Sequence, residues 1–264
     1  MKMKVRMESG RLRKPFPLND PKPMKMTPAN SEQAFTRLEL VIVLITLGLL
    51  AGIAFPVLGG NKARSEQALC FSNLRQIGHA FHLWANDHGD RNPWLTPVQQ
   101  GGTYNTTDPR KSDAWFQMSW ISNELVTPKI LVCPSDVGVG ADRKMATDFS
   151  SAGGGFVRLG FRSRSLSYVI GLHSFYDAPR SILSGDRNFR PESIDGSCST
   201  GVGDAWLLVY PNSSTVWTNA IHHETGNLLF TDGSVELSSS PGLNRAVNIP
   251  NQVDDTGHHF MVPP

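Results

Sequence analysis

Apolar residues follow two different patterns in the first third of the chain. In the first pattern, sixteen consecutive residues from Leu40 to Phe55 carry no charge and are almost all apolar. Together with its flanks, the segment 35–58 is long enough to cross a bilayer core of about 30 Å. We therefore expect a transmembrane helix over 35–58.

The second pattern is a single apolar stripe that begins after Pro56. Its members recur at spacings of 4, 3, 4 and 3 residues on an otherwise polar stretch: Cys70, Leu74, Ile77, Phe81 and Trp84. This spacing is typical of an amphipathic helix that buries one face. We predict that the helix continues over 59–89, docks through this stripe, and is capped by Gly89.

From residue 90 to 264, connections rich in Gly, Pro, Ser and Asn separate short strand-like runs: Ile130–Val132, Ser167–Ile170, Ser181–Leu183 and Thr215–Trp217. The clearest hairpin is 222–237, where Asp232-Gly233 joins two alternating segments and favours a two-residue type I′ turn. The predicted fold class is α+β, with a long N-terminal helix packed on a small antiparallel β-sheet head that has long loops.

Net charge divides the chain after residue 34. Residues 1–34 carry eight Lys or Arg and three acidic residues, a balance of +5, and subtracting this from +2 for the whole chain leaves −3 for the remainder. The positive-inside rule places such a basic leader in the cytoplasm. An acidic remainder does not favour nucleic-acid binding, and we expect no nucleic-acid partner.

The stretch Ala34-Phe35-Thr36-Arg37-Leu38-Glu39 resembles the N-terminal motif of type IV pilins and type II secretion pseudopilins. Members of these families carry a basic leader and a small residue, then Phe-Thr-Leu-x-Glu at the start of an apolar helix. Here Ala34 replaces the usual Gly and Arg37 replaces the usual Leu. The resemblance implies that a prepilin peptidase cuts between Ala34 and Phe35, that Phe35 is N-methylated, and that Glu39 acts in assembly.

The resemblance implies a structural subunit of a type II secretion or type IV pilus-like filament, not an enzyme. Its partners would be the prepilin peptidase, other pilin or pseudopilin subunits, the inner-membrane assembly platform and membrane lipid. The chain would cross the inner membrane once, with leader 1–34 cytoplasmic and head 90–264 periplasmic. A carboxylate at membrane depth costs about 2.5–3.5 kcal/mol, so Glu39 would pair with the N-terminus of a neighbouring subunit.

Three alternatives remain open at this stage. In the first alternative, the apolar segment is an uncleaved signal anchor or a secretory signal peptide. In the second, the chain is a surface pilin or an anchored module that binds carbohydrate or DNA. In the third, the head is an anchored enzyme that uses His222, His223 and Asp232.

A second motif lies near the C-terminus. His222, nine intervening residues and then Asp232-Gly233, with Asn227 between them, resemble the "H, nine residues, DG" domain of pseudopilin-like proteins of planctomycete and verrucomicrobial type. Three further segments resemble elements of the same proteins: Cys70–Gly78, Leu131–Asp136 and Leu183–Asn188. The resemblance therefore extends over most of the chain after Ala34.

A histidine and a carboxylate near one hairpin can orient each other for acid–base chemistry, or bind a metal together with Glu224. The His-Glu-x-x-His pattern of zinc proteases is incomplete, because Asn227 stands where the second His belongs. No nucleophile elbow, phosphate-binding loop or Cys-x-x-Cys pair occurs. We favour a structural interpretation, in which His222 bonds the backbone and Asp232 forms the turn.

The three cysteines, Cys70, Cys133 and Cys198, allow three single disulfide pairings. We prefer Cys70 with Cys133, because this bond ties the helix to the first strand region. The alternative is that Cys70 is only a small buried residue of the stripe.

We expect no cofactor, with a bound calcium ion as the alternative that the resemblance to pseudopilins leaves open. Major pseudopilins often hold calcium in a C-terminal loop, but the acidic positions of this chain lack the spacing of an oxygen cage: Asp136, Asp142, Asp148, Asp254 and Asp255. The arginines near residue 160 are expected on a solvated face, and the six tryptophans in core or interface packing.

Overall fold

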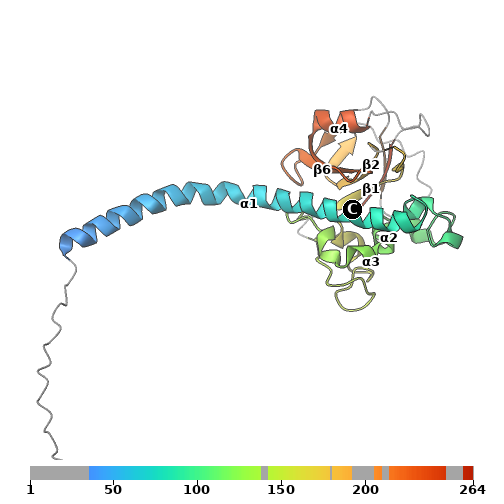
Figure 1. Cartoon of the computed structure of the whole chain (residues 1–264), viewed down its shortest axis with the longest axis horizontal. Helices are drawn as coiled ribbons and strands as arrows, with labels where there is room; N and C mark the ends of the chain where they lie inside the picture. The colour runs from blue at the N-terminus through green and yellow to red at the C-terminus, as the bar shows by residue number, and fades with distance from the viewer. Residues whose placement is uncertain are drawn as a thin grey trace, which may run out of the picture. The chain divides into compact units, whose positions relative to one another are not determined.

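The computed structural model describes residues 36–137, 142–178, 180–191, 205–209, 214–247 and 258–263, and for residues 52–61, 191 and 205–209 it describes the backbone alone. The chain divides into two compact units, Met1–Gly52 and Ile53–Pro264. One α-helix, α1 (Arg37–Asp87), contributes to both (Figure 1). Within the described residues, no helical stretch combines the length and the apolarity that a bilayer crossing requires.

In the first unit, the described side chains of α1 are exposed. The large apolar side chains from Leu38 to Leu50 have exposed fractions of 44–70%. Because apolar residues occupy every side of this stretch, no single face is available for docking on a sheet.

In the second unit, α1 buries the predicted stripe. Cys70, Leu74, Ile77 and Phe81 are 0% exposed and Trp84 is 5% exposed, so the predicted docking face is confirmed. A β-carbon at Gly78 would lie 2.8 Å from Cδ1 of Leu229, which shows how closely the helix approaches the sheet. The helix ends at Asp87, and Gly89 follows with a φ of +68°, in the left-handed conformation expected of a capping glycine.

The second unit contains a six-stranded sheet in the order β4-β8-β1-β2-β6-β7, in which all neighbours are antiparallel. A separate two-stranded sheet pairs β3 with β5. The strands are β1 (Tyr168–Gly171), β2 (Ile182–Asp186), β3 (Phe189–Pro191), β4 (Ala205–Val209), β5 (Thr215–Trp217), β6 (Thr225–Phe230), β7 (Val235–Ser239) and β8 (His258–Val262). The predicted α+β class with an antiparallel sheet is therefore confirmed.

Both faces of the six-stranded sheet are buried at the strands β8, β1, β2 and β6. Alternate strand residues such as Tyr168 and Leu229 pack with the α1 stripe, whereas their neighbours Val169 and Leu228 pack with α4 (Ser240–Val247) and with β3 and β5. Figure 1 shows α1 and α4 on opposite sides of the strands. The period-two alternation of side chains thus produces three layers.

Short helices complete the second unit: α2 (Ala114–Trp120), α3 (Ser122–Leu125), and the 3-10 helices η1 (Pro93–Leu95), η2 (Val98–Gln100), η3 (Pro109–Ser112), η4 (Pro128–Leu131) and η6 (Arg162–Ser165). The predicted strand Ile130–Val132 is wrong, because its first two residues belong to η4. Pro128 begins this turn and the Thr127 side chain accepts a hydrogen bond from the backbone N–H of Lys129, which is a helix-start arrangement.

The predicted hairpin joins β6 and β7, but its turn is not type I′. Of the four residues 231–234, only Gly233 has a positive φ, at +80°, whereas type I′ needs two. The N–H of Gly233 donates to Phe230 O, and the N–H of Phe230 donates to Ser234 O. This is a type I turn followed by a glycine bulge, which also suits an Asp-Gly sequence.

Candidate functional site

A disulfide joins α1 to the loop that follows η4. Cys70 and Cys133 are bonded, with Cα atoms 5.1 Å apart, and both residues are 0% exposed. This is the pairing that the sequence favoured. It fixes the buried stripe of α1 to a segment 63 residues further along the chain.

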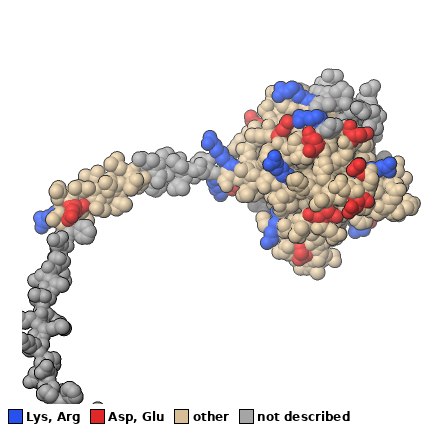
Figure 2. Space-filling model, in the orientation of Figure 1, with Lys and Arg blue, Asp and Glu red and all other residues tan. Residues whose placement is uncertain are grey.

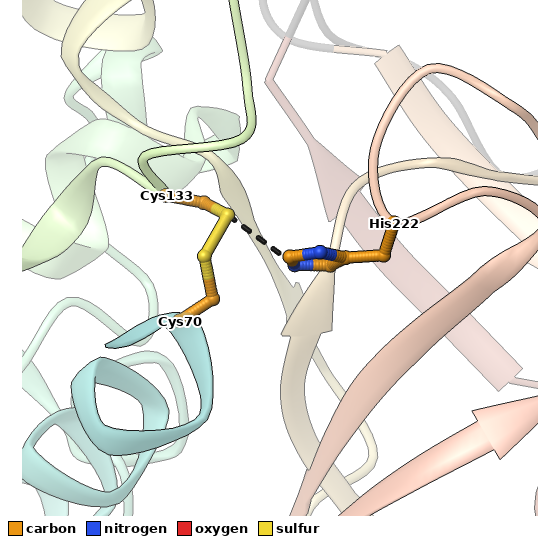
Figure 3. A group of neighbouring side chains, drawn as sticks. All are labelled: Cys70, Cys133 and His222. Carbon is orange, nitrogen blue, oxygen red and sulfur yellow. Dashed lines mark hydrogen bonds between the residues drawn. A yellow bond between two sulfur atoms is a disulfide. The ribbon is translucent and has the colours of Figure 1, made fainter. Parts of the chain in front are cut away.

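His222 lies against this disulfide. Its Nε2 atom is 3.3 Å from Sγ of Cys133, and its side chain is 2% exposed (Figure 3). The ring is therefore buried beside sulfur, and the structure differs here from the expectation that it bonds the backbone.

An unusual loop conformation presents the ring. His222, His223 and Glu224 have φ values of 54°, 49° and 61°, and each non-glycine residue in this left-handed region costs about 1–2 kcal/mol. Hydrogen bonds from Asn188 offset this backbone strain. Its Nδ2 group donates to three carbonyl oxygens of the loop at 2.6–3.0 Å, those of Thr218, Ile221 and Thr225.

Asp186, the last residue of β2, lies near the same nitrogen of the ring. Its Oδ2 atom is 3.6 Å from His222 Nε2 and accepts hydrogen bonds from the backbone N–H and the side-chain amide of Asn227. Oδ1 of Asp186 has no hydrogen-bond partner among the described residues. Gly185 allows the backbones of β2 and β6 to lie close together beside Asp186, because a β-carbon at residue 185 would lie 2.9 Å from Asn227 O.

Burial controls the charges of this pair. It raises the pKa of Asp186 to about 7, although the two hydrogen bonds from Asn227 oppose the shift, and the charge of Asp136 raises it further. Burial also lowers the pKa of His222. Both pKa shifts favour the neutral forms of the two groups, because the carboxyl and the imidazole meet in a poorly solvated environment.

A buried ion-pair triad supports the cluster. Arg187 donates to both carboxylate oxygens of Asp136 at 2.7 and 2.8 Å, and Arg143 Nε lies 3.1 Å from the same carboxylate. Burial opposes ionisation of Asp136, but the hydrogen bonds of Arg187 and the charge of Arg143 hold its pKa below its usual value. The triad ties the loop after Cys133 to the end of β2.

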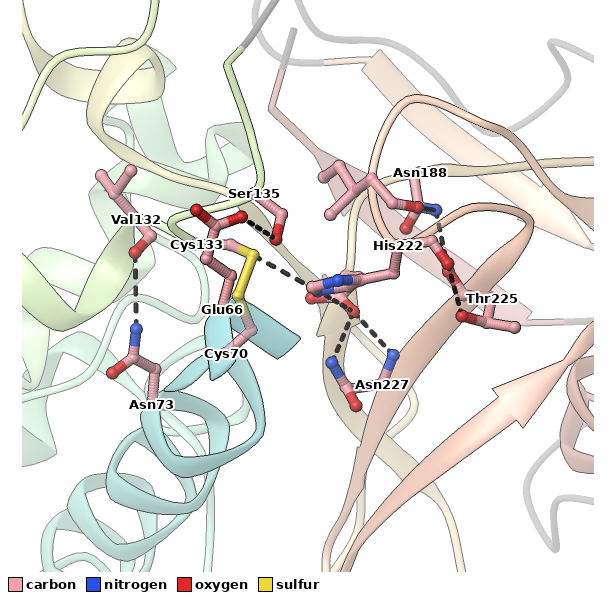
Figure 4. A network of polar contacts seen from close by, with 12 residues as sticks. Glu66, Cys70, Asn73, Val132, Cys133, Ser135, Asn188, His222, Thr225 and Asn227 are labelled. Atoms are coloured by element: carbon pink, nitrogen blue, oxygen red, sulfur yellow. Dashed lines mark hydrogen bonds and ion pairs between the residues drawn. A yellow bond between two sulfur atoms is a disulfide. The ribbon is translucent and has the colours of Figure 1, made fainter. Parts of the chain in front are cut away.

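We call Cys70, Cys133, Asp186 and His222 the disulfide–histidine cluster. A hollow of about 370 Å³ opens beside it and is lined by residues that include Glu66, Ser135, Asn219, His222 and His223. The hydroxyl of Ser135 donates to Glu66 at 3.3 Å across this opening (Figure 4). The three segments that resemble the "H, nine residues, DG" proteins thus meet here: 70–78, 131–136 and 183–188.

The Asp232-Gly233 part of that motif lies elsewhere. His222 precedes β6 and Asp232 follows it, and a six-residue strand spans about 20 Å. Asp232 accepts hydrogen bonds from the N–H and the hydroxyl of Ser234, as the turn requires. The hypothesis of an acid–base pair between His222 and Asp232 is therefore wrong, and the carboxyl beside His222 belongs to Asp186.

Three of the other polar candidates have partners within the protein. His223 is exposed and contacts Asn219 at 3.2 Å. Arg164 pairs with Asp142, and Arg162 lies over the ring of Trp115. On the face shown in Figure 2, acidic and basic side chains of the second unit are interspersed.

The start of α1 carries a capping box that the sequence analysis missed. The Thr36 hydroxyl accepts from the N–H of Glu39 at 3.2 Å, and Glu39 Oε2 accepts from the N–H and the hydroxyl of Thr36 at 2.9 and 3.0 Å. The Thr-x-x-Glu spacing was the available signal. Ala34 and Phe35, the predicted cleavage site, lie outside the described residues.

Comparison with known proteins gives one partial likeness. The chain is 32% identical over 57 residues to type II secretion system core protein G of Aeromonas hydrophila. The match covers 22% of this chain and 40% of that protein. No family model matches, and no solved structure matches.

Proposed function

We propose that this chain is a pilin-like structural subunit that is anchored in the inner membrane and assembled through its N-terminal helix. The observation that carries the proposal is the exposed apolar surface of α1 from Leu38 to Leu50. A surface of this kind requires either lipid or another apolar helix as its partner. The partial likeness to a type II secretion protein supports the same assignment.

Glu39 gives this surface a specific contact. In the single chain, its carboxylate is occupied by the N–H and the hydroxyl of Thr36. In a filament, the same carboxylate would meet the charged N-terminus of Phe35 in a neighbouring subunit. The exchange of a local cap for an intermolecular ion pair couples assembly to removal of the leader, because only cleavage creates that amine.

The proposed partners follow from this mechanism. A prepilin peptidase would remove residues 1–34 and methylate Phe35, the inner-membrane platform would extract the subunit, and other pilin or pseudopilin subunits would receive it. The second unit would remain on the periplasmic side. Its disulfide agrees with that location, because such bonds persist in oxidising compartments.

A catalytic role receives less support. His222, His223 and Asp232 do not form one site, and the ring of His222 is 2% exposed. A carbohydrate platform also lacks support, because Trp120 is the one exposed tryptophan among those whose side chains are described. We therefore infer a structural role for the second unit.

The N-terminus of the protein purified from its own membranes tests the proposal. The expected result is a chain that begins at N-methyl-Phe35, with the matching intact mass. A bulky residue in Ala34→Trp should block cleavage, and Ala34→Gly, which restores the usual family residue, should preserve it. A chain that retains residues before Ala34, or that begins beyond Phe55, contradicts the proposal.

A further inference from the structure

The disulfide–histidine cluster contains the donor set of a metal site. Sγ of Cys70, Sγ of Cys133 and Nε2 of His222 all lie within 4.8 Å of one another (Figure 3). Two thiolates and an imidazole are ligands that zinc prefers. In the oxidised chain, the bond between the two sulfurs excludes a metal.

We propose that reduction of the Cys70–Cys133 disulfide opens a buried zinc site, in which both thiolates and His222 Nε2 bind the ion and Asp186 supplies the fourth ligand. The inference concerns the second unit alone and does not depend on filament assembly. The same cluster would then have two exclusive states, a disulfide and a metal site.

The distances from His222 suit a tetrahedral centre, whereas Asp186 lies outside the group of ligand atoms within 4.8 Å of one another and has to move toward the sulfurs to bind the same ion. With usual zinc bond lengths, a sulfur and a nitrogen ligand lie about 3.5 Å apart, and a nitrogen and an oxygen ligand about 3.3 Å apart. In the structure, Sγ of Cys133 lies 3.3 Å from Nε2 of His222, and the same nitrogen lies 3.6 Å from Oδ2 of Asp186. Two thiolates on one ion lie about 3.8 Å apart, which side-chain rotation allows once the covalent bond is broken.

The backbone around the ligands is held independently of the disulfide. Asn188 fixes the loop that carries His222, and the ion pair of Arg187 with Asp136 fixes the loop after Cys133. Cys70 lies on α1, whose buried stripe packs on the sheet. The ligands therefore have supports that survive reduction, as a preorganised site requires.

In the disulfide state, the Asp186 carboxyl has one oxygen that accepts no hydrogen bond from the described residues. Its Oδ1 atom is fully buried and lacks a hydrogen-bond partner among the described residues. Such an atom is costly in an apolar interior, and a cation would compensate for it. The hollow beside His222, with Glu66 at its edge, gives the ion a route from solvent.

The chemistry balances with a dithiol as reductant. The dithiol gives two electrons to the Cys70–Cys133 bond and becomes a disulfide itself, and the two cysteines gain protons. Zinc then displaces both thiol protons, which pass to water. Sulfur and nitrogen ligands select zinc over calcium or magnesium, which require oxygen ligands.

Metal binding by the full-length, untagged chain in detergent tests the proposal. Cys198→Ser should be present throughout, so that the third cysteine contributes no thiol. After reduction with a phosphine, we expect about one tightly bound Zn²⁺ per chain, and none in the oxidised chain. Co²⁺ should give the thiolate charge-transfer and tetrahedral bands in absorption. The proposal fails if the reduced chain binds no stoichiometric metal, or binds it only when circular dichroism shows it unfolded.

Two neighbouring histidines provide a matched pair of variants. His222→Ala should weaken zinc binding at least tenfold, whereas His223→Ala, which removes an exposed ring, should leave it unchanged. Equal affinities for the two variants overturn the proposal. If His222→Ala does not fold, X-ray absorption of the zinc-loaded parent decides: a shell with two sulfurs and a nitrogen supports the site, and a shell without sulfur overturns it.

Discussion

Two stretches of α1 are helical for different reasons. From Leu38 to Leu50, the large apolar side chains are 44–70% exposed, whereas the stripe from Cys70 to Trp84 is at most 5% exposed. The first stretch has local support, a capping box at its start and its own backbone hydrogen bonds. The second is stabilised by packing on a sheet. Apolar side chains are thus left exposed in one stretch and are used for intramolecular packing in the other.

Truncation of the buried stripe should have the largest effect on stability. Phe81 is 0% exposed and packs edge-on against the ring of Trp94, with 5.5 Å between the ring centroids. Phe81→Ala should therefore lower the free energy of unfolding by about 3–5 kcal/mol. Urea denaturation followed by tryptophan fluorescence measures this. Leu83→Ala is the matched control, because Leu83 is 56% exposed, and it should change the free energy by about 0.5 kcal/mol or less. Similar losses for both variants contradict the docked face.

The disulfide should have the next largest effect. It closes a loop of 63 residues, for which chain entropy predicts a stabilisation of about 4 kcal/mol. Cys70→Ala combined with Cys133→Ala should therefore lower the free energy of unfolding by about 3–4 kcal/mol in the presence of a chelator. The double variant should not respond to reductant, whereas the parent should. A parent whose stability is unaffected by reduction excludes this role for the bond.

The sequence predicted the parts of the site that local patterns encode. The stripe spacing placed Cys70 on the buried face, and Cys133 was preferred as its partner because the bond would tie the helix to the first strand region. Asp186 was missed as the partner of His222, because 36 residues separate them and only the pairing of β2 with β6 brings them close. The predicted strand at Ile130 failed because a proline and a capping threonine favour a helical turn over isolated β-propensity.

The buried carboxyl of Asp186 should make stability depend on pH. Its folded pKa of about 7 lies above the ordinary value of 3.8, so between about pH 4 and 7 the folded state binds more protons, and stability falls as pH rises through this window. Asp186→Asn removes the ionisation and keeps an acceptor for Asn227. Each pKa unit corresponds to about 1.4 kcal/mol.

The neighbours of Asp186 limit the size of this effect. His222 at 3.6 Å, Asp136 through its charge and Tyr168 opposite on β1 all face the carboxyl. We expect the oxidised Asp186→Asn variant to gain about 1–3 kcal/mol relative to the parent between pH 5 and pH 8, measured by denaturation at each pH. A difference that is constant with pH contradicts the raised pKa.

Changes at the start of α1 should affect the stability of the second unit least, by about 0.5 kcal/mol or less, and should separate capping from assembly. Glu39→Gln keeps a side chain that can complete a capping box but removes the negative charge. Thr36→Ala keeps the charge but removes the hydroxyl that accepts from Glu39 N–H, at a local cost of about 1 kcal/mol. Hydrogen exchange at residues 37–40 should therefore accelerate in Thr36→Ala, whereas cross-linked oligomers in membranes should disappear in Glu39→Gln. If Thr36→Ala abolishes oligomers as completely as Glu39→Gln does, the helix start matters for assembly and the ion pair with a neighbouring N-terminus does not.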